Sequence, residues 1–189
     1  MSTALIVAVV TMAAFYGIVF LQSLYFQQER GSSALETGLL FLPMTALVAI
    51  LNPWVARLMA RYGHAAMIAA GQVVMAAGLA GLCFLPADAP VLLVAALMVP
   101  VGVGGSFTVP SIIAVVMDHV PAERTGTASG VVNTARQVGG SLGVAIFGAV
   151  LASGEFMAGV RASLGATAAV LIILVVASLA LRHGRQREV

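Results

Sequence analysis

Six long stretches of apolar residues limit what this chain can fold into more than any other feature. They fill most of its 189 residues and are joined by short connections. A helix needs about 20 mostly apolar residues to cross a bilayer, and its backbone groups must be hydrogen-bonded there without help from water. We therefore predict six membrane-spanning helices, at residues 4–26, 38–59, 65–85, 91–117, 126–152 and 162–181.

The scarcity of charge supports a membrane-embedded fold. Only 8% of the residues are charged and 61% are hydrophobic, whereas a soluble domain carries about 25% charged residues. Little chain is left outside the six stretches, so we expect one all-α domain over residues 1–189, a polytopic six-helix bundle. Nucleic-acid binding is not expected, because the arginines stand mostly at predicted helix ends and form no basic cluster.

The distribution of arginine predicts the orientation in the membrane. Arginine and lysine are enriched in cytoplasmic loops. The connections after the second and fourth stretches, together with the tail, hold Arg57, Arg61, Arg124, Arg182, Arg185 and Arg187. The opposite side holds only Arg30 and Arg161. We therefore expect a multi-pass protein of the plasma membrane (a bacterial inner membrane) with both termini in the cytoplasm.

The fifth stretch, residues 126–152, carries a polar stripe. Ser129, Asn133, Arg136, Gln137 and Gly140 recur at spacings of three and four, so they share one face of a helix. Arg136 lies about 15 Å into that helix, near the bilayer centre, where an arginine costs about 2.5–3.5 kcal/mol on insertion scales. We expect the stripe to line a substrate or ion path. The structural alternative is hydrogen bonding between helices, with Arg136 snorkelling to the surface.

Two pairs of glycines in the same stretch predict helix packing. Gly126 and Gly130 stand four residues apart, and so do Gly139 and Gly143. Small residues at this spacing let another helix approach closely within a membrane. We therefore expect all four glycines to lie at a helix–helix contact.

The fourth and first stretches contain further candidate residues. Pro100, Gly104 and Pro110 interrupt the fourth stretch, and interrupted spans often lie at transporter binding sites. A static kink that only shapes packing explains these residues equally well. In the first stretch, Tyr16 and Gln22 are deep enough to face a central cavity.

An enzyme is not expected from the residue pattern. The segment from Gly126 to Gly130 faintly resembles a serine nucleophile loop around Ser129, which would need a histidine base at membrane depth. His64, His119 and His183 all lie in predicted connections or the tail, and all seven acids lie outside the membrane centre. No cluster has metal-ligand spacing and no phosphate-binding loop is present, so we expect neither a metal nor a cofactor.

Three sequence segments carry a family resemblance. They run from Gly31 to Pro43, from Asn52 to Gly63, and from Val120 to Ala145, the last containing the run Arg136-Gln137-Val138-Gly139-Gly140. Together they resemble the major facilitator superfamily, specifically the C-terminal half of its fourteen-helix drug:proton antiporters, which export multiple drugs.

The resemblance implies a bundle that exports small amphipathic or cationic compounds in exchange for protons. Substrate would bind between this bundle and an N-terminal half of six or eight helices, and rocking of the halves would release it. Asn133, Arg136 and Gln137 would line the central cavity. Arg57, Arg61 and Gly63 would belong to a cytoplasmic gating loop, in which the family's acidic residue is replaced by Ala60.

A complete member of that family has twelve or fourteen helices, whereas this chain has six predicted spans. Three hypotheses follow from this difference. In the first, the chain is a fragment that forms one half of a carrier. In the second, it is a transport-inactive truncated protein or an assembly subunit. In the third, two copies pair as a homodimeric half-transporter.

Overall fold

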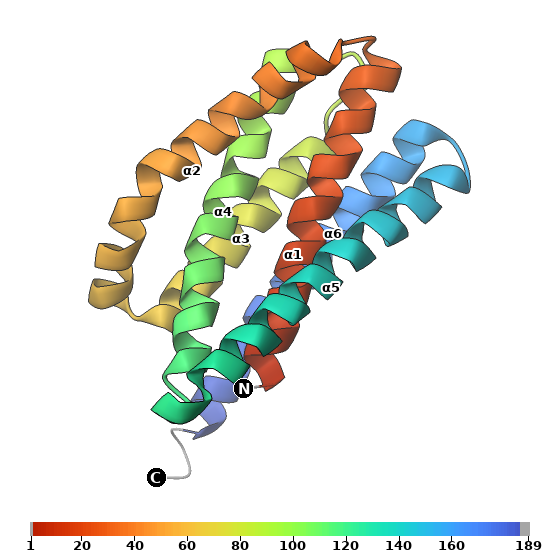
Figure 1. Cartoon of the computed structure of the whole chain (residues 1–189). Coiled ribbons are helices and arrows are strands. Elements are labelled where there is room, and N and C mark those ends of the chain that lie inside the picture. The colour runs from red at the N-terminus through yellow and green to blue at the C-terminus, as the bar shows by residue number, and fades with distance from the viewer. Residues whose placement is uncertain (1, 186–189) are drawn as a thin grey trace.

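The computed structural model describes residues 2–185, and side-chain surroundings for residues 4–176. The described residues form helices and no strand, in the order α1 (Ser2–Leu24), η1 (Tyr25–Glu29), α2 (Ala34–Tyr62), α3 (His64–Cys83), α4 (Val91–Met117), η2 (Ala122–Arg124), α5 (Thr125–Ala152) and α6 (Phe156–Arg185). The six α-helices are each long and apolar enough to cross a membrane (Figure 1). The predicted all-α fold with six membrane-spanning helices is confirmed.

α2 and α6 begin four and six residues earlier than predicted, the largest differences among the helix starts. Ser33 caps α2: its Oγ accepts a hydrogen bond from the Glu36 amide at 3.2 Å, and the Glu36 carboxylate accepts one from the Ser33 amide at 2.8 Å. This reciprocal capping box starts α2 at Ala34. The first turns of α6 include Arg161, whose guanidinium donates to the carbonyl oxygen of Leu85 at 3.2 Å. A charged residue is thereby accommodated near the start of the helix.

The helices alternate in direction along the chain. The start of α1 and the end of α6 therefore lie at the same end of the bundle as the α2–α3 and α4–α5 connections (Figure 1). These are the segments that contain most of the arginines. The arginine count predicted that these segments share one side of the membrane, and the structure places them at one end of the bundle. That this end faces the cytoplasm stays a prediction.

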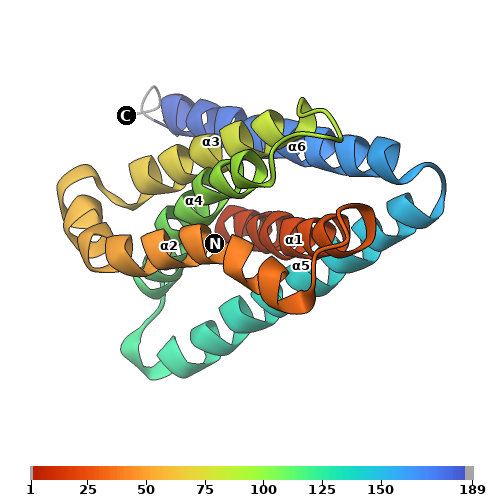
Figure 2. The same ribbon diagram turned by 90° about the horizontal axis from the view of Figure 1, so that it is seen from above.

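The hydrophobic core lies where α1, α3, α4 and α6 meet. α3 packs along α4 and α6, while α5 packs on α1 and α2 on α4 (Figure 2). α2 and α5 are the least buried of the six helices and are called the outer helices below. Large side chains from four helices are fully enclosed at the centre, including Ile18, Leu21, Met75, Leu79, Met98 and Leu164.

Gly104 lets α4 approach α3 at backbone distance. A Cβ at Gly104 would overlap the carbonyl oxygen of Gly71, and a Cβ at Gly71 would overlap that of Gly104. α4 is helical from Val91 to Met117 and continues through Pro100 and Pro110. The helix therefore has no break at Pro100 or Pro110. The small residue Gly104 instead allows close packing of α4 on α3.

The two glycine pairs of α5 have different surroundings. Cβ atoms at Gly139 and Gly143 would overlap the backbone of Val9 and Ala13, so these glycines set α5 directly against α1. Gly126 and Gly130, in contrast, have no atom of another described residue within 4 Å of a Cβ position. Gly130 precedes Gly139 by nine residues, or about two and a half turns, and therefore points away from α1. The packing role expected of Gly126 and Gly130 finds no partner helix among the described residues.

This difference predicts unequal effects of two identical substitutions. Gly143→Ala is expected to force α5 away from α1 and to lower the stability of the folded bundle by about 1–3 kcal/mol, as overpacking does. Gly130→Ala places its methyl group in open space and is expected to leave stability unchanged or slightly raised. Thermal unfolding of the two variants in the same detergent would show this, and equal midpoints would contradict the proposed backbone contact.

Candidate functional site

The polar stripe of α5 lies beside the face that packs on α1. Ser129, Asn133 and Gln137 are exposed, and Arg136 is half-buried. The neighbouring buried face consists of Ala128, Val132, Gly139, Gly140, Gly143 and Phe147. Packing on α1 thus fixes the rotation of α5 and presents the stripe at the surface of the bundle.

Arg136 is inserted between α1 and α4. It lines a small crevice with Ala8 and Met12 of α1 and with Val109 and Ile112 of α4. Its Nε is buried and has no hydrogen-bond partner among the described residues. An unpaired buried donor costs about 1–3 kcal/mol, and more when it is charged. Among the described residues, no group offsets this cost at Arg136.

Tyr16 lies at the seam between α1 and α5, next to the stripe. Its side chain is 45% exposed, and a Cβ at Gly140 would come within 2.9 Å of its ring. Since Gly140 is about one turn beyond Arg136 and Gln137 on α5, the structure brings Tyr16 to the stripe. Glycine at position 140 is what leaves room for the ring.

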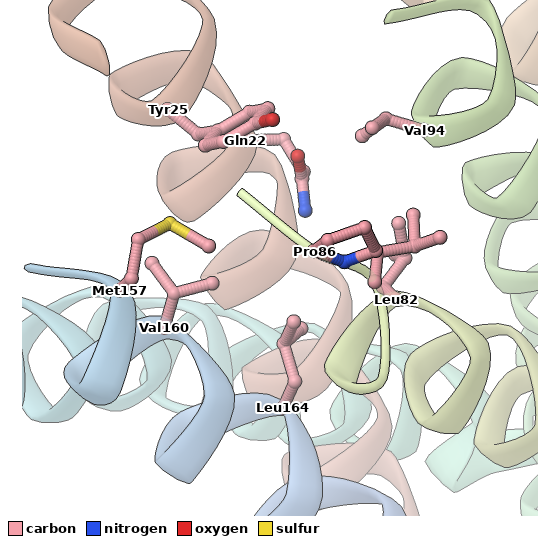
Figure 3. Close-up of a pocket in the computed structure, with 9 residues that line it drawn as sticks. Gln22, Tyr25, Leu82, Pro86, Val94, Met157, Val160 and Leu164 are labelled. Carbon is pink, nitrogen blue, oxygen red and sulfur yellow. The ribbon is translucent and has the colours of Figure 1, made fainter. Parts of the chain in front are cut away.

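The structure separates Gln22 from this group. Its side chain is 3% exposed and points into a small cavity of about 20 Å³ at the meeting of α1, α3, α4 and α6, toward Pro86 and Leu164 (Figure 3). Its Oε1 has no partner among the described residues. The space suffices for about one water molecule. Gln22 is thus an interior residue of the bundle, which corrects the expectation that it lines a central path.

A polar link inside the bilayer joins α1 to α3. Gln72 Nε2 donates a hydrogen bond to Thr11 Oγ1 at 2.8 Å, and Thr11 Oγ1 donates to the carbonyl oxygen of Val7 at 2.7 Å. Both side chains are at least 98% buried. Sequence reasoning missed this pair. A glutamine in an otherwise apolar stretch is the only signal that could have pointed to it.

The arginines at the opposite end anchor the turn between α3 and α4. Arg30 donates to the carbonyl oxygen of Ala87 at 2.9 Å, and the hydroxyl of Tyr25 donates to the same oxygen at 3.0 Å. Arg161 donates to the carbonyl oxygen of Leu85. These contacts tie the segment after α1 and the start of α6 to one turn, so both arginines have structural roles.

The α2–α3 connection presents its arginines next to aromatic rings. The guanidinium of Arg57 lies 4.9 Å from the centre of the Trp54 ring, and that of Arg61 lies 5.3 Å from the Tyr62 ring. Gly63 joins the two helices with a φ of +80°, a backbone conformation that residues other than glycine rarely adopt. No carboxylate of the described residues pairs with either arginine, so both remain available to a partner surface.

Metal binding has no support in the described part of the chain. Among those residues, no three His, Cys, Asp or Glu side chains come together in a way that could hold a metal ion. The one contact found there between a basic and an acidic side chain brings His64 Nε2 within 3.6 Å of an Asp118 carboxylate oxygen, linking the start of α3 to the end of α4.

Comparison with known proteins identifies related sequences. The family described as Major Facilitator Superfamily matches residues 1–144. The multidrug resistance protein Stp of Mycobacterium tuberculosis is 37% identical over 140 residues, covering 74% of this chain and 26% of that protein. The tetracenomycin C resistance and export protein of Streptomyces glaucescens is 31% identical over 153 residues, covering 81% and 28%.

A third relative agrees with these two. The methylenomycin A resistance protein of Streptomyces coelicolor is 31% identical over 140 residues, covering 74% of this chain and 30% of that protein. The aligned part of the chain thus corresponds to between 26% and 30% of the length of these three relatives.

The position of the stripe predicts a difference in water access between two sites on α5. Two single-cysteine variants, Gln137→Cys and Ile146→Cys, are made in a Cys83→Ser background. We expect the thiol of Gln137→Cys to react at least tenfold faster with a hydrophilic maleimide than the thiol of Ile146→Cys. The two positions are nine residues apart, so their side chains point in opposite directions from the helix. A thiol reacts through its thiolate form, which forms where the thiol contacts water. Labelling rates of protein in lipid vesicles would measure this. Equal rates would place the stripe against lipid.

Proposed function

Because this chain belongs to the Major Facilitator Superfamily, we propose that it is one half of a proton-driven exporter of small amphipathic or cationic compounds. Its six spans make it a multi-pass membrane protein. The observation that carries the proposal is the exposed polar stripe of α5 with the unpaired Arg136 at its centre. The names of its relatives refer to drug resistance and export, which agrees with this function.

The depth of Arg136 supports a role in transport. It lies eleven residues after Thr125 in a helix of 28 residues, close to the middle of the span. Ionisable residues at this depth usually mark substrate or ion pathways. In the proposed mechanism, Arg136 pairs with a carboxylate, while Asn133 and Gln137 hydrogen-bond to substrate.

The exposed surfaces of α2 and α5 support a second bundle. Within an 18-residue apolar segment of each helix, only 11% of α2 and 22% of α5 is buried, against 50% of α4. We propose that the second bundle covers these two helices and that the central path lies between the bundles. An N-terminal half of six or eight helices fits the greater length of the relatives, and a second copy of this chain is the other possible partner.

Proton coupling is assigned to that second bundle. The acids of the described residues stand at helix ends or in connections, and Glu36, for example, lies in the first turn of α2. A proton-driven carrier needs a titratable group at membrane depth. We propose that such a carboxylate comes from the partner and pairs with Arg136 when it is ionised.

The remaining assignments follow from this arrangement. Arg57 and Arg61, which precede Gly63 at the end of α2, are proposed to contact acidic helix ends of the partner at a cytoplasmic gate. Both termini are proposed to be cytoplasmic, in the plasma membrane. The chain is proposed to move its substrate without changing it chemically, and so not to be an enzyme.

Removing the charge of Arg136 tests the proposal. In liposomes with an imposed pH gradient, the carrier with both of its bundles is expected to transport a cationic fluorescent dye. Arg136→Ala is expected to lower the initial rate at least tenfold while inserting normally. Arg124→Ala changes an arginine in the α4–α5 connection and should keep the rate. Normal transport by Arg136→Ala would refute the role of this residue.

The same assay identifies the partner of this bundle. If transport requires an N-terminal half, the 189-residue chain alone should show no dye movement driven by the pH gradient, and its mass in detergent should be that of one chain. Dye movement by a particle of twice 19.2 kDa would instead assign the faces of α2 and α5 to a second copy.

A further inference from the structure

A large cavity lies between α1, α5 and α6, with a volume of about 470 Å³. This lateral cavity is lined by apolar side chains and by the hydroxyl-bearing residues Ser163 and Thr167 of α6. Three of its lining residues, Leu142, Ile146 and Val170, are 46%, 55% and 43% exposed. The cavity therefore opens between apolar side chains and is reached from the bilayer.

Small residues and helix geometry create the space. The Gly143 contact holds α5 on α1 at Ala13, whereas α6 diverges from α5 beyond their shared turn, with α1 between them (Figure 2). On α6, Ala162 and Ala166 line the gap and are too small to fill it. Ligand pockets in proteins typically have about 300–1,000 Å³ and mostly apolar walls. The lateral cavity meets both conditions.

The lateral cavity is separate from the polar stripe. Leu142 and Ile146 line it, and each follows a stripe residue, Asn133 or Gln137, by nine residues. Nine residues are about two and a half turns, so each lining residue points away from its stripe counterpart. The two features therefore use opposite flanks of α5.

Ser163 lines the lateral cavity and has an unpaired hydroxyl, whose oxygen is covered in the rotamer that the structure shows. The residue is 5% exposed, and its Oγ has no hydrogen-bond partner among the described residues. The neighbouring hydroxyl of Thr167 is already used, because it donates to the carbonyl oxygen of Ser163 at 2.7 Å. Serine Oγ turns about a single bond between staggered positions, and a change of rotamer would bring it to the cavity surface, where it can donate to a bound molecule. An acyl chain offers no acceptor for it, whereas a carbonyl compound does.

We propose that the lateral cavity binds an apolar molecule of drug size with one carbonyl group, which enters from the bilayer and accepts a hydrogen bond from Ser163. The aliphatic and aromatic walls hold the apolar part of the molecule, and the carbonyl fixes its orientation. Binding at this site requires neither a proton gradient nor Arg136. The site is thus independent of the proposed export function.

Photolabelling with benzophenone, which has two rings and one carbonyl, tests this site. The protein is placed in phosphatidylcholine vesicles without a pH gradient, so lipid is always present as a competitor. We expect saturable labelling of peptides from α1 and α6. Ala166→Phe fills the cavity and should lower this labelling at least tenfold. The control Ala46→Phe changes an exposed residue of α2, a helix that does not line the cavity, and should leave the labelling unchanged.

Competition with diphenylmethane, which lacks the carbonyl, tests the role of Ser163. Unlabelled benzophenone should compete about fivefold better than diphenylmethane, the factor expected from one hydrogen bond, and Ser163→Ala should abolish the difference. Equal competition by both compounds in the unchanged protein would overturn the assignment of Ser163. Labelling that never saturates, or that is the same in Ala166→Phe as in Ala46→Phe, would overturn the site. Arg136→Ala should label normally, which separates this result from a failure of export.

Discussion

The contact of α5 with α1 at Gly139 and Gly143 determines how the candidate functional features of α5 are positioned. The glycines let the backbones of the two helices touch, and this contact fixes how α5 is rotated about its axis. One flank then carries Asn133 and Gln137 at the surface, and the other forms a wall of the lateral cavity. Small residues are a common means of association in membranes, because no hydrophobic force draws apolar helices together out of lipid.

The same principle separates a fixed interior from outer helices. Gly71 and Gly104 join α3 to α4 at backbone distance, and the Gln72–Thr11 hydrogen bond joins α3 to α1. α2 and α5 have few buried residues by comparison. A bundle built this way is closely packed on its inner side and leaves the surfaces of two helices exposed.

Much of the fold could be predicted because apolar length alone defines a membrane span. The six helices follow from it, and the Ser33–Glu36 box could have given the start of α2. Spacing could not distinguish Gly126 and Gly130 from Gly139 and Gly143, because four-residue spacing says nothing about which face meets a neighbour. Gln22 and Tyr16 both looked suitable for a cavity, yet only the packing of α1 decides that one is interior and the other exposed. The lateral cavity had no signal in the sequence, since it arises from side chains that are small and from the divergence of two helices.

The arginine contacts with the α3–α4 turn have a mechanical consequence. Arg30 and Arg161 bind carbonyl oxygens of one turn from two sides, and thereby fasten α1, α3, α4 and α6 to each other at a single end. Nearer the middle of the bundle, the Gln72–Thr11 hydrogen bond and the Gly71–Gly104 contact also hold α1, α3 and α4 together. At the opposite end, among the described residues, His64 lies 3.6 Å from Asp118, and the Ser129 hydroxyl donates to Met117 Sδ at 3.9 Å. Neither contact involves α2, so any flexing of this bundle should be smallest at the α3–α4 turn and largest at the end of α2 that contains Arg57 and Arg61.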